Sequence, residues 1–189
     1  MSTTYRQRHR TGNTISFEAS RAQGIYGSMA QSIAGSTSIR TQNNRTAAPA
    51  DAVELTLRVR YAETDQMGVV HHANYLVWFE AARSEFCRQR DIDYRQMETD
   101  GLLLPMAESH CRYLKPAFYD DEVVVRSWVM DVKRSVLRIG YEATRGDTLL
   151  ATGETVQVLV DRASMRPRSF PQHISDRFKG TTRELEENE

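Results

Sequence analysis

The most regular pattern of apolar residues lies between residues 75 and 90 and has the period of an α-helix. At about 100° per residue, one side of this helix is apolar and the other side carries polar residues such as Glu80 and Arg88. The apolar stripe consists of Tyr75, Trp78, Phe79, Ala82 and Phe86. The pattern predicts one long helix, ending near Arg90, that is buried along one side.

Alternation of apolar and polar residues predicts a strand over residues 54–61, with Leu55, Leu57, Val59 and Tyr61 on the buried face. After the helix and a charged turn over residues 91–101, no second helical pattern is expected. Four further strands are predicted instead, over residues 103–114, 122–131, 135–144 and 149–160. A run of hairpins makes an antiparallel sheet, so the expected fold is α+β, with a five-stranded antiparallel sheet and the single long helix packed across its apolar face.

The first fifty residues have a different composition. They are rich in Ser, Thr, Asn, Gln and Gly, and no apolar pattern lasts more than a few positions. Such a segment cannot bury enough surface to offset its ordering entropy. We therefore expect a disordered extension over residues 1–51, which could be an organelle transit peptide, one folded domain over 52–172, and a charged tail over 173–189.

Charge and cysteine content exclude several classes of protein. The net charge of the 189 residues is zero, with +5 in the first fifty residues and −5 in the remainder. The folded part therefore lacks the positive footprint that nucleic acid requires, and no apolar run is long enough to span a membrane. Cys87 and Cys111 are expected to be small apolar residues, not a disulfide or a metal site.

The segment before the helix carries the candidate chemistry. It places Asp65, the flexible Gly68, and the adjacent His71 and His72 in a loop that leads into the helix. Unpaired backbone N–H groups and the positive end of the helix dipole gather at such a point. Two neighbouring histidines have no third ligand at a suitable spacing, so we expect no metal.

Three segments resemble the hotdog-fold acyl-CoA thioesterases of the 4-hydroxybenzoyl-CoA thioesterase and YbgC-like family. They read RYAETDQMGVVHHANYLVWFEAAR from residue 60, RYLKPAFYDDEVVV from residue 112 and VDRASMRPRSFP from residue 160. The resemblance implies a hotdog fold, in which a curled antiparallel sheet wraps around one central helix. It also implies a homodimer or homotetramer with active sites at subunit interfaces, and hydrolysis of an acyl-CoA without a metal or organic cofactor.

By this resemblance, Asp65 matches the catalytic carboxylate. It would attack the thioester or draw a proton from water, while N–H groups near His72 and Ala73 stabilise the oxyanion. Gly68 would permit close backbone approach. The His72 side chain could orient Asp65 or water, or could have a purely structural role.

Other residues are candidates for contact with the substrate or for a structural role. His71 stands where the family often has Tyr, and His71, Val70 and Tyr75 are expected to line the substrate site. Tyr61 could contact the acyl group, although as an inward residue of the first strand it is more simply part of the core. The simplest role of Asn74 is to cap the helix. Lys133 and Arg134 are candidates for contact with coenzyme A phosphates.

We therefore expect a cytoplasmic acyl-CoA thioesterase, or an organellar one if the extension is a transit peptide. A hotdog dehydratase or hydratase, and a non-catalytic acyl-CoA-binding module, remain alternatives. The acyl group itself does not follow from the sequence, because the residues that close the acyl site come from packing between subunits.

Overall fold

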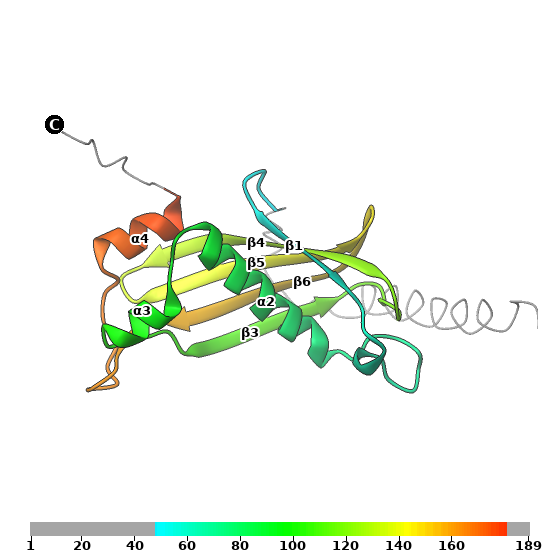
Figure 1. Ribbon diagram of the computed structural model, residues 1–189, viewed down its shortest axis with the longest axis horizontal. Helices are drawn as coiled ribbons and strands as arrows, with labels where there is room; N and C mark the ends of the chain where they lie inside the picture. The colour runs from blue at the N-terminus through cyan, green and yellow to red at the C-terminus, as the bar shows by residue number, and fades with distance from the viewer. Residues whose placement is uncertain (1–47, 181–189) are drawn as a thin grey trace, which may run out of the picture.

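The computed structural model describes residues 48–180 of the chain. Most of the predicted disordered extension (1–51) and the last nine residues of the predicted tail therefore lie outside the described residues. The longest helix, α2, lies across one face of a curved sheet, and two short helices lie at one end of it (Figure 1). The helices are η1 (Tyr61–Glu63), α2 (Ala73–Gln89), α3 (Tyr94–Thr99) and α4 (Gln172–Lys179). The strands are β1 (Val53–Arg58), β2 (Leu102–Leu103), β3 (Met106–Tyr113), β4 (Glu122–Lys133), β5 (Val136–Arg145), β6 (Thr148–Val158) and β7 (Val160–Asp161).

The main sheet is antiparallel and has five strands in the order β1-β4-β5-β6-β3, while β2 and β7 form a small second sheet. The predicted hairpin between β5 and β6 is confirmed, with Arg145 opposite Thr148 and Gly146 at a positive φ of 52°. Together with the single long helix, this order confirms the expected α+β hotdog fold.

The predicted stripe of α2 forms the centre of the core. All five of its members are at most 3% exposed. The ring of Phe79 stacks on Tyr141 of β5, with 4.6 Å between ring centroids. It also lies over Gly153 of β6, where an added Cβ would be 2.2 Å from the Phe79 ring. The glycine therefore allows the helix to approach the sheet closely, and the helix in turn fixes where the loop before it begins.

Several expectations are corrected. Tyr61 does not continue the buried face of β1, because the strand ends at Arg58 and the chain turns into η1, leaving Tyr61 78% exposed. The charged turn over 91–101 contains helix α3, which Asp93 caps by accepting bonds from the Arg95 and Gln96 amides. The tail does not begin at residue 173. Residues 172–179 form α4, and this helix contributes Ile174 and Phe178 to the core.

The edge strand β3 differs from the other long strands because seven of its eight residues are exposed. Among the described strands it bonds to β6 on one side only, so within residues 48–180 its other side has no partner strand. Cys87 is buried and Cys111, on this strand, is half-buried, and both are free thiols. Within residues 48–180, no helix is both long and apolar enough to cross a membrane.

Candidate active site

Asp65 lies in a tight loop between η1 and α2, and its half-buried side chain is used within that loop. Its Oδ1 accepts a hydrogen bond from the amide of Met67 at 2.8 Å. Its own amide donates to the carbonyl of Val69 at 2.9 Å, and Thr64 pairs with Val70 in an antiparallel bridge. Within the described chain Asp65 makes no hydrogen bond to α2, so the loop alone sets where its carboxylate lies.

Gly68 closes this loop. Its amide donates to the carbonyl of Asp65 at 2.9 Å, and its φ of +74° lies in the left-handed region. An added Cβ would meet no described atom within 4 Å. Within the described residues the role of Gly68 is to allow a left-handed turn, and close approach of a substrate to its backbone stays a prediction.

The backbone amides near the start of α2 differ in whether they are already used. Val70 N donates to the carbonyl of Ala117 at 2.9 Å, and His71 N donates to the carbonyl of Glu63 at 2.8 Å. By contrast, His72 N has no partner among the described residues, and Ala73 N has only a long contact of 3.4 Å to His71 Nδ1. The amides of His72 and Ala73 are therefore the two predicted donors that remain open to a ligand at the positive end of the helix dipole.

The side chains of His71 and His72 are exposed and lie against each other, with 4.1 Å between ring centroids. The carbonyl of His72 accepts a hydrogen bond from the hydroxyl of Tyr113, at the end of β3, at 3.0 Å. Desolvation of its hydroxyl, followed by a hydrogen bond with Cys111, raises the pKa of Tyr113 to about 12, although the residue as a whole is 42% exposed. The Tyr113 hydroxyl therefore stays protonated at neutral pH and donates to the start of α2.

The side chains of Tyr75 and Asn74 make hydrogen bonds within the protein. The Tyr75 ring is 3% exposed, and its hydroxyl accepts from the amide of Ala117 at 3.2 Å. The predicted cap Asn74 lies within α2 and donates through Nδ2 to the carbonyl of Glu63 at 2.7 Å. The residue at the N-cap is His72, whose side chain makes no capping hydrogen bond.

Glu63 is the residue of this region that the sequence did not single out. Its carboxylate is 5% exposed and accepts hydrogen bonds from Arg60 and from the indole of Trp78. Burial by itself would raise the pKa of Glu63, but these hydrogen bonds outweigh burial and lower it below 4.5. The only sequence signal was an acid beside a predicted strand end, which is usually a solvated residue.

Lys133 and Arg134 lie at the far end of the sheet. Glu122, at the first residue of β4, pairs with Arg58 just before the η1 loop, whereas Lys133 is the last residue of β4. At about 3.3 Å per strand residue, the two ends are roughly 35 Å apart. Lys133 is also paired with Asp131 at 2.9 Å. Within one chain, the structure therefore does not bring Lys133 and Arg134 together with Asp65.

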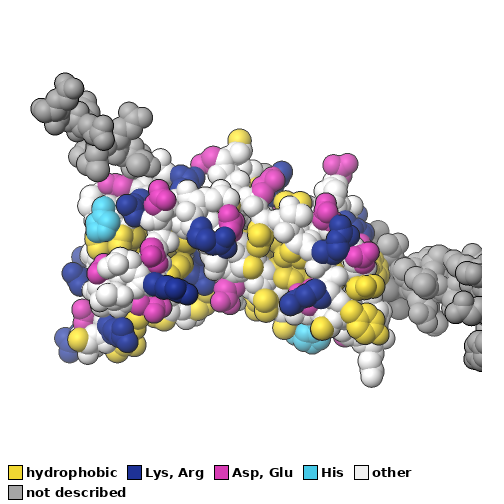
Figure 2. Space-filling view, in the orientation of Figure 1, with side chains coloured by type: hydrophobic (Ala, Val, Ile, Leu, Met, Phe, Trp, Pro, Cys, Tyr) yellow, Lys and Arg dark blue, Asp and Glu magenta, His cyan; other side chains and the backbone are white. Residues whose placement is uncertain are grey.

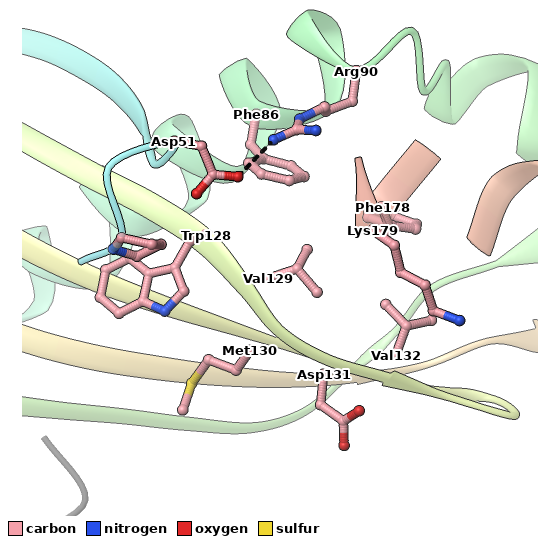
Figure 3. Close-up of a pocket in the computed structure, with 11 residues that line it drawn as sticks. Asp51, Phe86, Arg90, Trp128, Val129, Met130, Asp131, Val132, Phe178 and Lys179 are labelled. Atoms are coloured by element: carbon pink, nitrogen blue, oxygen red, sulfur yellow. Dashed lines mark ion pairs between the residues drawn. The ribbon is translucent and has the colours of Figure 1, made fainter. Parts of the chain in front are cut away.

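Two pockets lie near the C-terminal half of α2, away from the loop of Asp65. One, of about 280 Å³, lies between α2, β4 and α4, and an ion pair between Asp51 and Arg90 crosses it at 3.6 Å (Figure 3). The other, of about 520 Å³, lies beside α3 and includes Cys87 and Tyr94. None of the predicted site residues lines either pocket, so neither is the candidate active site.

Charged side chains of both signs are mixed on the face seen in Figure 2, with apolar side chains between them. This face therefore shows no single positive footprint of the kind that binds nucleic acid. Among residues 48–180, no three His, Cys, Asp or Glu side chains are grouped closely enough to hold a metal ion.

The fold and the sequence motif before α2 identify the class of protein to which this chain belongs. The model of the thioesterase-like superfamily matches residues 59–178, from the end of β1 through α4. The chain belongs to this superfamily, and the expected enzyme class, thioester hydrolase, is confirmed by that membership.

Individual relatives agree with this assignment. The Bacillus subtilis protein YneP is 36% identical over 121 residues, which cover 64% of this chain and 88% of YneP. The acyl-CoA thioesterase YbgC of Haemophilus influenzae is 33% identical over 124 residues, which cover 65% of this chain and 90% of YbgC. The crystal structure of the hypothetical protein TT1821 of Thermus thermophilus superposes with a TM-score of 0.64 at 32% identity, covering 69% of this chain and 99% of that one.

Proposed function

We propose that the protein is an acyl-CoA thioesterase, which hydrolyses an acyl-CoA to the free acid and coenzyme A. The observation that carries this proposal is the pair of open amides, His72 N and Ala73 N, at the start of the central helix in a chain of the thioesterase-like superfamily. The acyl-CoA substrate is supported by the name of the relative YbgC.

Thioester hydrolysis needs an attacking oxygen and a stabilised oxyanion, because the carbonyl is already electrophilic and the thiolate leaves readily. Asp65 supplies the first, by attacking the carbonyl carbon to give a mixed anhydride or by taking a proton from the attacking water. The amides of His72 and Ala73 supply the second, since both lie at a helix N-terminus, His72 N has no partner among the described residues, and Ala73 N makes only a long hydrogen bond of 3.4 Å to His71 Nδ1. The His72 ring is exposed and needs no catalytic role in this scheme.

The active form is a homodimer or a larger homo-oligomer in this proposal. Support comes from β3, an exposed edge strand with no partner on its outer side among the described residues. Pairing of β3 with β3 of a second copy would extend the sheet and bring a second copy of α2 near the loop of Asp65. The substrate would then lie between subunits, with pantetheine reaching inward and the nucleotide near the surface.

A panel of acetyl-, hexanoyl-, palmitoyl- and benzoyl-CoA, followed by release of free thiol, tests the activity. The proposal predicts thiol release in step with free acid for at least one member of the panel. Formation or loss of a 2-enoyl group without thiol release, measured with crotonyl-CoA, would indicate a dehydratase or hydratase instead. Thermal stabilisation by acyl-CoA without any turnover would indicate a binding module. The expected cytoplasmic location remains a prediction.

A further inference from the structure

The carboxylate of Glu63 is buried two residues before Asp65, and every contact it makes is with a donor. Its Oε2 accepts from the backbone amide of Arg60 at 2.7 Å. Its Oε1 accepts from Nη2 of Arg60 at 3.0 Å and from Nε1 of Trp78 at 3.1 Å. Carboxylates are rarely buried unless they are paired in this way. The side chain of Glu63 therefore joins the end of η1 to the second turn of α2.

The backbone carbonyl of Glu63 also connects the end of η1 to α2. Its carbonyl accepts from the amide of His71 at 2.8 Å and from Nδ2 of Asn74 at 2.7 Å. The first bond closes the loop that contains Asp65, and the second connects this closed end to the first turn of α2. Through its side chain and its carbonyl together, Glu63 contacts both ends of the loop and the first two turns of the helix.

Asp65 has no comparable connection of its own. Among residues 48–180, its carboxylate bonds only to Met67 within the loop, and its amide bonds to Val69 across the loop. Consecutive Cα atoms are about 3.8 Å apart, so a shift at Glu63 is transmitted to Asp65 over only two such steps. The contacts of Glu63 therefore help to fix the position of this loop relative to α2, together with the bond from the amide of Val70 to the carbonyl of Ala117.

We propose that Glu63 is a positioning residue, whose buried carboxylate and carbonyl hold the loop of Asp65 in register with the amides of His72 and Ala73. The inference rests on the proposed thioesterase activity and adds a further residue to it. Glu63 touches no substrate in this scheme. Its effect is on the geometry of the reacting groups, and misplacement by about 1 Å can lower a rate by about 100-fold. The lowered pKa of Glu63 agrees with a carboxylate that is ionised at neutral pH.

The test uses Glu63→Gln, which preserves shape but places an N–H group where only donors now point. The readouts are kcat and KM for the best substrate of the panel above, the melting temperature, the oligomeric state and the Trp fluorescence. We expect kcat to fall by about 10- to 100-fold with KM changed by less than about threefold. We also expect a shifted emission maximum, since Trp78 loses an ionised partner, while the protein remains folded and assembled at the assay temperature.

Two further variants separate positioning from stability. Trp78→Phe removes the Nε1 donor to the same oxygen, so it should lower kcat in the same direction, and the double variant should be no worse than Glu63→Gln. Glu122→Gln is the matched control, because Glu122 is an exposed carboxylate paired with Arg58 at 3.0 Å near the same loop. Glu122→Gln should leave kcat and fluorescence unchanged.

The inference is overturned if Glu63→Gln keeps a wild-type kcat, or if its loss of activity only follows the fraction of unfolded protein. If Glu63→Gln does not fold, Trp78→Phe becomes the deciding variant. A wild-type kcat in Trp78→Phe would contradict the proposal that the bond between Glu63 and the Trp78 indole positions the loop of Asp65. Absence of thiol release by the wild type across the whole panel would instead overturn the proposed function. The two failures are therefore distinguishable.

Discussion

The hydroxyl of Tyr113, at the end of the edge strand β3, donates a hydrogen bond to the carbonyl of His72 at the start of α2, 41 residues earlier, at 3.0 Å. This bond connects the exposed edge of the sheet to the residue whose amide is open to a ligand. The rings of Tyr113 and Tyr75 also meet edge to face, with 5.2 Å between centroids. The start of the central helix is thus held from the side on which we propose that a second subunit packs.

Removal of this hydroxyl should affect catalysis more than folding. Tyr113→Phe keeps the ring contact with Tyr75 but loses the hydrogen bond to His72. A hydrogen bond contributes about 1 kcal/mol, and the loss of that much transition-state stabilisation should lower kcat by about threefold to fivefold. Tyr119→Phe is the control, because Tyr119 is an exposed tyrosine whose one ring contact within residues 48–180 is with Tyr61. Steady-state thiol release measures both. An equal effect of the two variants would contradict a role for the Tyr113 bond.

The backbone amide of His72, not its ring, is the proposed oxyanion donor. His72 has φ −52° and ψ −33°, which proline can adopt, so His72→Pro removes the N–H with little distortion of φ. We expect His72→Pro to lower kcat by about 100-fold or more, and His72→Ala to stay within about threefold of the wild type. Circular dichroism checks that both variants are folded. Activity that survives in His72→Pro but is lost in His72→Ala would assign the role to the imidazole.

The helix and the sheet could be predicted from the sequence because their apolar patterns are long and regular. The stripe of α2 and the inward face of β5, from Leu137 to Ala143, are all buried as expected. Tyr61 shows where such patterns fail. In the sequence, the alternation of apolar and polar residues continues past Arg58. In the structure, the chain leaves the sheet at Arg58, and the sequence pattern does not report that departure.

The two short helices had local signals that the apolar period could not reveal. Asp93 is a strong N-cap residue with Gly101 following the helix, and α4 is bounded by Pro171 and by Gly180 in the left-handed conformation. Glu63 is a different case. Its burial depends on an indole 15 residues later in the chain, and no local pattern reports that contact.

The contact between Gly153 and Phe79 predicts a large effect on stability. In Gly153→Ala the new Cβ would lie 2.2 Å from the Phe79 ring, so this buried ring, or the helix that carries it, must shift. We expect a loss of about 1 to 3 kcal/mol in the free energy of unfolding, measured with urea. The comparison is Gly146→Ala in the β5-β6 hairpin, where no described atom lies within 4 Å and only the positive φ is costly, at about 1 kcal/mol. A smaller loss at Gly153 than at Gly146 would contradict the close packing of helix on sheet.

Acid stability should depend on Glu63. Its pKa is lowered in the folded protein from an ordinary value of 4.5, so its ionised form favours folding above that value. This contribution is lost as the pH falls through the lowered pKa. The difference in unfolding free energy between the wild type and Glu63→Gln should therefore be largest near neutral pH and should shrink as the pH falls from 4.5 through the lowered pKa of Glu63. Urea titrations at several pH values test this, and a difference that does not change with pH would show that the ionised carboxylate is not what matters.

In the proposed mechanism, the Asp65 carboxylate drives hydrolysis opposite the amides of His72 and Ala73 at the start of α2. The most direct measurement is kcat of Asp65→Asn for the best acyl-CoA of the panel, on protein shown to have wild-type folding and oligomeric state. Since Asn can still accept the Met67 bond but neither attacks a carbonyl nor takes a proton at neutral pH, we predict a loss of turnover of at least about 1,000-fold. Hydrolysis by Asp65→Asn at a rate close to that of the wild type would contradict the account.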